Sequence, residues 1–109
     1  MTQITTHILD TSTGRPAAGV AVSVSVFLDG AWQLLAQKST NDDGRTGPMI
    51  QDGTPGIYKL HFETGAYFEQ TGRSGFYPYV DLIFTTSNEP HYHVPLLLNP
   101  YGYSTYRGS

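Results

Sequence analysis

Cysteine is absent from this sequence of 109 residues. Without a thiol the chain can form no disulfide framework, thiolate zinc site or iron–sulfur cluster, and it has no cysteine nucleophile. Basic residues are also few, because Lys and Arg together number 6 and the formal net charge is −3. A protein that neutralises the phosphates of a nucleic acid needs a basic surface, so we predict no nucleic-acid partner.

Long apolar runs are missing as well. No stretch approaches the roughly 20 apolar residues that a transmembrane helix requires, so we predict no membrane partner. Residues 1–7 contain neither a basic segment nor an apolar one, and they do not resemble a secretory signal peptide. We therefore expect a soluble, cytoplasmic protein.

Glycine (12 residues), proline (7) and tyrosine (8) are plentiful, whereas only 14% of the residues are charged. Chain breakers and aromatic residues in these amounts favour short strands joined by tight turns over a helical bundle. Hydrophobic residues make up 39% of the chain, which is enough for one core but not for two. We expect a single domain over residues 1–109.

Alternation of side-chain type with a period of two runs through most of the sequence. It is clearest at residues 20–26, where four valines fall on one face of the expected strand. Asp29 and Gly30, which both tolerate positive φ, predict a hairpin turn after that strand. We expect strands at residues 4–9, 20–27, 32–37, 57–63, 79–84, 92–98 and 101–107, and one short helix at 65–70. This pattern predicts an all-β fold, an antiparallel two-sheet β-sandwich of about eight strands.

Parity places two histidines on the outward faces of their strands. His7 alternates with Ile4 and Ile8, and His93 alternates with Val94 and Leu96. Because the apolar residues of each strand are the expected core set, both imidazoles point away from the core. Two histidines on outward sheet faces are compatible with one shared site, although the sequence alone does not bring them together.

The polar residues that could carry chemistry are four histidines and two arginines: His7, His61, His91, His93, Arg45 and Arg107. Histidine titrates near neutral pH, so it can take a proton from water and return it to a leaving nitrogen. A guanidinium stays charged and presents a fork of donors to an oxyanion or a ureide oxygen. Such groups are sufficient for a hydrolase that acts on an activated amide.

Simpler interpretations of the same residues stay open. A histidine on an outward strand face is commonly a solvated polar residue. Arg45 follows a turn that holds Asp42 and Asp43, and an exposed ion pair there would contribute only ~0–1 kcal/mol. Arg73 is expected to be a solvated charge.

His91 and His93 have the i, i+2 spacing of metal-binding strands. A bare pair is weak support for a metal site, because a site needs a third ligand and here no thiolate can supply it. A metal-dependent hydrolase that uses these two residues and another histidine stays open as an alternative.

The C-terminal sequence 91–109, which reads HYHVPLLLNPYGYSTYRGS, resembles the signature of the 5-hydroxyisourate hydrolases, the transthyretin-related enzymes of urate breakdown. The ending at 106–109 is what separates these enzymes from the hormone-carrying transthyretins. Further segments match the family in the same order, at residues 6–10 with 14–17, 43–45 with 55–58, and 75–78. The resemblance therefore covers essentially the whole chain.

The resemblance implies roles for particular residues. The first-strand catalytic histidine, the active-site arginine and the second catalytic histidine of the family correspond to His7, Arg45 and His93. The family's terminal tetrapeptide, which lines the site, corresponds to Tyr106, Arg107, Gly108 and Ser109. The carriers have a lysine where the hydrolases have the first histidine, and an acidic residue where they have the arginine.

The resemblance also implies an assembly and a reaction. The family fold is a sandwich of two four-stranded sheets with one short helix, and four copies form a homotetramer, a dimer of dimers with active sites in the channel between dimers. We expect the chain to hydrolyse 5-hydroxyisourate, a small purine-derived substrate, to 2-oxo-4-hydroxy-4-carboxy-5-ureidoimidazoline, with no cofactor and no metal. The alternative is a transthyretin-like carrier that binds a small ligand without turnover.

Overall fold

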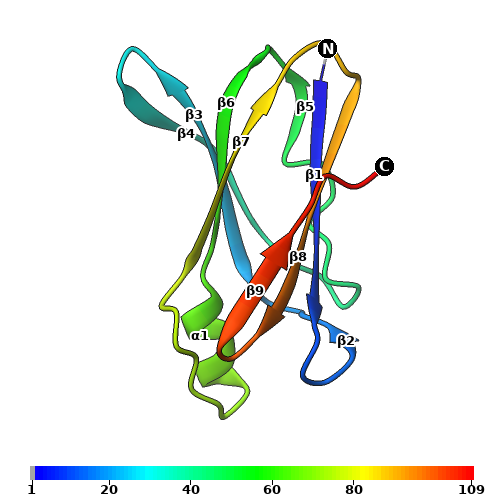
Figure 1. Ribbon diagram of the computed structural model, residues 1–109, viewed down its shortest axis with the longest axis vertical. Coiled ribbons are helices and arrows are strands. Elements are labelled where there is room, and N and C mark those ends of the chain that lie inside the picture. The colour runs from blue at the N-terminus through cyan, green and yellow to red at the C-terminus, as the bar shows by residue number, and fades with distance from the viewer. Residues whose placement is uncertain (1) are drawn as a thin grey trace.

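The computed structural model describes residues 2–109, so Met1, the first residue of the predicted domain, lies outside the described part. Within residues 2–109 the chain forms nine strands and one helix, and the strands lie in two sheets that face each other (Figure 1). The predicted all-β sandwich of two sheets with one short helix is confirmed.

The first sheet has the order β2-β1-β8-β9, and β5 pairs with β1 beside β2. Its strands are β1 (Thr2–Asp10), β2 (Arg15–Pro16), β5 (Ile50–Gly53), β8 (His91–Asn99) and β9 (Gly102–Thr105). All pairings are antiparallel except that β1 and β8 run parallel, which makes this sheet mixed. The parallel pairing places the two ends of the chain side by side.

The second sheet has the order β4-β3-β6-β7 and is antiparallel throughout. Its strands are β3 (Ala21–Leu28), β4 (Ala31–Ser39), β6 (Gly56–Phe62) and β7 (Val80–Thr86). The predicted hairpin joins β3 to β4, where Asp29 and Gly30 have φ of 53° and 79°. Positive φ at both central residues gives a turn whose twist matches that of the flanking strands.

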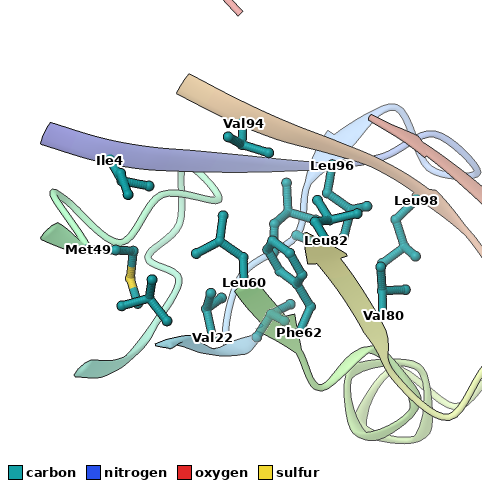
Figure 2. Packing of buried hydrophobic residues seen from close by; sticks show 14 of the residues in the cluster. Ile4, Val22, Met49, Leu60, Phe62, Val80, Leu82, Val94, Leu96 and Leu98 are labelled. Carbon is teal, nitrogen blue, oxygen red and sulfur yellow. The ribbon is translucent and has the colours of Figure 1, made fainter. Parts of the chain in front are cut away.

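The core lies between the two sheets, and Figure 2 shows its aliphatic side chains meeting from both. The four valines of the predicted β3 face are all buried, as are Ile4, Ile8 and Leu60. On β8 the even-numbered residues from Tyr92 to Leu98 point inward. The outward face of β1 and β8 is thereby left for polar side chains, as parity predicts.

Helix α1 (Thr64–Gln70) follows β6 and is fixed to the end of β1 by a buried carboxylate. Asp10 is fully buried, and it accepts hydrogen bonds from Tyr67 Oη at 2.8 Å and Arg73 Nη2 at 2.7 Å. The expectation that Arg73 is a solvated charge is therefore wrong. Sequence distance hides this ion pair, because the partners meet only when α1 packs against β1.

Two strands differ from their expected bounds. β5 lies within residues 45–56, where no strand was predicted. It forms because this segment pairs with the edge of β1. Ile4 pairs with Ile50, and Met49 N donates a hydrogen bond to Ile4 O at 2.8 Å. β9 ends at Thr105, earlier than the predicted 107, although Gly108 still bridges His93 in the register that β9 has with β8. No helix within residues 2–109 is long and apolar enough to cross a membrane.

Candidate active site

The register between β1 and β8 creates the candidate site. Thr5 lies opposite His93, and His7 lies opposite Pro95. Thr5, His7 and His93 are half-buried on the outward face, whereas their neighbours Ile4 and Ile8 are fully buried. The predicted outward orientation of both histidines is thus confirmed, and the parallel pairing brings their strands into contact.

Arg45 reaches this face through a tight turn. Gly44 has φ of 74°, and its N–H donates to Asn41 O at 2.9 Å. Ile8 N donates to Gly44 O at 3.0 Å, and Arg45 forms an antiparallel bridge with His7. A Cβ on residue 44 would lie 2.5 Å from Ile8 O, so only glycine allows the turn to approach β1 this closely.

The C-terminal tail closes the other side of the site. Gly108 forms an antiparallel bridge with His93, and Gly108 N donates to His93 O at 2.7 Å. A Cβ on Gly108 would lie 2.7 Å from Cδ2 of the His93 ring, so glycine makes room for the imidazole. The terminal residue, Ser109, follows directly and faces the same pocket.

β1 with β8, the Arg45 turn and the C-terminal tail border a pocket of about 340 Å³ that is open to solvent. Its walls are Thr5, Thr6, Arg45, Gly47, His91, His93 and Ser109. Of the predicted site residues, Arg45, His93 and Ser109 line this pocket together. Gly108 lies against the His93 ring, and His7 lies beside Arg45.

Tyr106 and Arg107 lie elsewhere. They line a second, largely apolar pocket of about 350 Å³ between β7 and the tail. The Arg107 guanidinium lies 4.6 Å from the centroid of the Tyr92 ring, on the opposite side of β8 from the His93 pocket. In one chain, these two predicted substrate-binding residues do not reach the site.

The Thr5 hydroxyl joins two imidazoles. Its Oγ1 is 2.8 Å from Nδ1 of His93 and 2.8 Å from Nε2 of His91. Both distances are those of good hydrogen bonds. With Nδ1 of His93 held by Thr5, the ring nitrogen left for another partner is Nε2.

Burial and nearby positive charge keep the two predicted catalytic histidines neutral. Burial lowers the pKa of His93 from its usual 6.5. The positive charges of Arg45, His7 and His91 act in the same direction. Burial and then Arg45 also lower the pKa of His7, although the Asp43 backbone and carboxylate partly oppose them. A neutral imidazole has a free lone pair, which is the form that a general base requires.

His61 takes no part in this site. It lies on the outward face of the other sheet, where Nδ1 is 2.6 Å from Oδ1 of Asp81 and Nε2 contacts Glu63. Burial alone would lower the pKa of His61, but the hydrogen bonds to both carboxylates raise it. The contact between His61 and Asp81 joins β6 to β7.

The structure gives little support for a metal site. Among residues 2–109, no group of three or more His, Asp or Glu side chains could hold one. The predicted absence of a metal and of a cofactor stays a prediction. The arrangement of neutral imidazoles, a guanidinium and a hydroxyl is suited to moving a proton and stabilising an oxyanion.

Thr5 is not among the predicted site residues. Its parity is the same as that of His7, which places it on the same face of the strand. Only the parallel register of β1 on β8 places its hydroxyl between His91 and His93.

Known proteins match the chain over nearly its whole length. The HIUase/Transthyretin family matches residues 4–108. The probable 5-hydroxyisourate hydrolase of Schizosaccharomyces pombe is 46% identical, over 97% of this chain and 90% of that protein.

Solved structures agree with the fold. The structure of Klebsiella pneumoniae 5-hydroxyisourate hydrolase superposes with a TM-score of 0.90 at 43% identity, over 100% of both chains. Sea bream transthyretin in complex with thyroxine superposes with a TM-score of 0.91 at 32% identity, over 96% of this chain and 93% of that one. The backbone alone thus does not separate hydrolase from carrier.

Proposed function

Because the chain belongs to the HIUase/transthyretin family, we propose that it hydrolyses 5-hydroxyisourate, the substrate named for its S. pombe and K. pneumoniae relatives, in urate degradation. The observation that carries the proposal is the convergence of a neutral His93 and the Arg45 guanidinium on one small pocket. A carrier needs neither a base nor an oxyanion partner there.

In the proposed reaction, water attacks a carbonyl of the six-membered ring. Nε2 of His93 takes a proton from that water as the new C–O bond forms. His7, which lies beside Arg45, helps to orient the water. Arg45 donates hydrogen bonds to the oxygen on which negative charge develops. The C–N bond of the ring then breaks, and a site histidine returns the proton to the leaving nitrogen, which gives 2-oxo-4-hydroxy-4-carboxy-5-ureidoimidazoline.

The terminal tetrapeptide is proposed to complete substrate binding. Ser109 lines the pocket and Gly108 lies against His93, whereas Tyr106 and Arg107 line the second pocket. These two residues can serve the reaction from a neighbouring subunit, since a two-fold axis lays a second copy of the same surface opposite the first.

A homotetramer built as a dimer of dimers is part of the proposal. Strands β7 and β9 are both terminal in their sheets and flank the same pocket. Terminal strands leave a row of unpaired backbone N–H and C=O groups, which pair readily with another strand. A cytoplasmic location stays a prediction.

The competing function is that of a small-ligand carrier. The superposition on sea bream transthyretin in complex with thyroxine supports this alternative. The two differ in turnover. A carrier would bind a small aromatic ligand with measurable affinity and leave the decay of 5-hydroxyisourate at its spontaneous rate.

The deciding experiment follows the ultraviolet decay of freshly prepared 5-hydroxyisourate with and without the protein. We expect strong acceleration by the wild type, with the same rate in a parallel sample treated exhaustively with a chelator. His93→Ala should reduce kcat by roughly 10²- to 10⁴-fold, the usual contribution of a general base. Decay at the spontaneous rate would refute the function, and loss of rate on chelation would favour the metal-dependent alternative.

A further inference from the structure

We propose that Thr5 and His91 form a proton relay behind His93, which carries the proton taken from water away from Arg45 and then returns it. This inference rests on the proposed function, because it assigns two additional residues to that reaction. It starts from one hydroxyl, Thr5 Oγ1, which lies 2.8 Å from Nδ1 of His93 and 2.8 Å from Nε2 of His91.

A threonine hydroxyl has one proton, so it cannot donate to both rings at once. In the two arrangements that can pass a proton between the rings, it accepts a hydrogen bond from one imidazole and donates its own proton to the other. If Nδ1 of His93 is protonated, Nε2 of His93 has a free lone pair, and Thr5 donates to His91. If Nε2 of His91 is protonated instead, Thr5 donates to His93, and the proton of neutral His93 is on Nε2. The hydroxyl thus couples the tautomers of the two rings.

The forward step uses the first arrangement. Nε2 of His93 takes a proton from the attacking water, Nδ1 passes its own proton to Thr5, and Thr5 passes its proton to Nε2 of His91. His93 is then neutral with a proton on Nε2, Thr5 is again a hydroxyl, and His91 carries the positive charge. The number of protons in the chain has risen by the one that came from water.

The return step reverses these transfers. Nε2 of His93 gives its proton to the leaving ring nitrogen while Nδ1 receives one from Thr5 and Thr5 receives one from His91. The starting arrangement is restored, and the proton from water is on the product. One residue, His93, thereby acts first as base and then as acid.

The surroundings favour moving the charge outward. His93 is half-buried and lies in the pocket with Arg45, where a second positive charge is costly. His91 is exposed on the rim of the same pocket, where water can stabilise an imidazolium. The two ring centroids are 6.3 Å apart, and the hydroxyl that contacts a nitrogen of each ring provides the path between them.

The test compares variants of Thr5, His91 and His61 with the wild type in the ultraviolet assay. Thr5→Val removes the hydroxyl but keeps the shape of the side chain and suits a strand. Thr5→Ser keeps the hydroxyl. His91→Gln can still hydrogen-bond to Thr5 but cannot take up a proton. His61→Gln removes a histidine from the opposite sheet and serves as the control.

We expect Thr5→Val and His91→Gln to lower kcat by roughly 10- to 100-fold with little change in KM, because proton transfer is impaired and binding is not. Thr5→Ser should restore most of kcat, and added imidazole should partly rescue His91→Ala. Circular dichroism melts confirm that each variant is folded, and Thr5→Ala replaces Thr5→Val if the valine variant is not.

Three results would overturn the relay while leaving the hydrolase function intact: full kcat in Thr5→Val, no recovery in Thr5→Ser, or full kcat in His91→Gln. The last would show that Thr5 only orients His93. A wild type that does not accelerate the decay refutes the hydrolase function itself, and the relay with it, so the two failures are distinguishable.

Discussion

At the scale of single residues, the site depends on which protonation state each imidazole holds. Burial and the charge of Arg45 both lower the pKa of His7 and His93 below 6.5. A lowered pKa means that the neutral, basic form persists at neutral and mildly acidic pH and is lost only as the pH falls below the usual value.

Activity should therefore stay constant through neutral pH and fall only in the acidic range, with a midpoint lower than the usual pKa of histidine, as His93 is protonated. Arg45→Gln removes one cause of the lowered pKa, so the midpoint of the His93 ring titration should move to higher pH. Two-dimensional NMR of the histidine rings measures this midpoint without relying on turnover. Arg45→Lys keeps the charge and should leave the midpoint close to that of the wild type; an equal shift in both variants would refute this cause.

Gly108→Ala tests how closely the tail fixes His93. The new Cβ would lie 2.7 Å from Cδ2 of the ring, so the ring has to move. A displacement of about 1 Å in a catalytic group can cost on the order of 100-fold, and we expect a loss of kcat of that size. Gly102→Ala is the matched control, because its Cβ would meet no atom closer than 3.8 Å. Unchanged kcat in Gly108→Ala would show that His93 does not act in this position.

At the scale of elements, one buried carboxylate fixes α1 and the loop after it to the end of β1. Burial by itself would raise the pKa of Asp10, but hydrogen bonds from Arg73, Ser12 and Tyr67 outweigh it and lower the pKa from 3.8 to about 2. The ionised form is therefore strongly favoured in the folded chain.

Because the folded pKa of Asp10 is lowered, its contribution to stability is present above about pH 4 and is lost as the pH falls towards 2. The shift corresponds to about 2 kcal/mol of folding free energy. Asp10→Asn should lower the free energy of unfolding by about that amount at pH 7 and much less at pH 2.5. Urea unfolding at one fixed protein concentration measures both values. Asp52→Asn, at an exposed position, should have little effect; an equal loss at both pH values would contradict the assignment.

At the scale of the whole molecule, the His93 pocket is open to solvent, and two predicted substrate-binding residues, Tyr106 and Arg107, line a different pocket. Exposed aromatic side chains gather near the last strand, with Tyr101, Tyr103 and Tyr106 exposed to 76%, 42% and 59%. Tyrosine is enriched in protein interfaces, so this surface favours contact with further copies of the chain.

We expect the wild type to sediment as a tetramer, and Tyr101→Glu to sediment as a smaller species with reduced turnover. A buried carboxylate at an interface would be unpaired, which disfavours association. Leu34→Glu is the control, because Leu34 is similarly exposed at 64% but lies on β4, at the other end of its sheet from β7. A fully tetrameric Tyr101→Glu would contradict the assembly, and sedimentation velocity decides between the outcomes.

The sequence by itself determined the class of fold, the hairpin at Asp29 and Gly30 and the outward orientation of His7 and His93. These properties depend on parity and on local φ preferences, which act between near neighbours in the chain. Its resemblance to the hydrolases also pointed to Arg45, His93 and the terminal residues.

Only the tertiary structure decided which of those residues meet. The parallel pairing of β1 with β8 placed Thr5 between two imidazoles and gave His91 a partner. The packing of α1 turned Arg73 from an expected surface charge into the partner of a buried carboxylate. Each of these contacts joins residues more than 60 positions apart, and periodicity within a strand holds no information about its register with another.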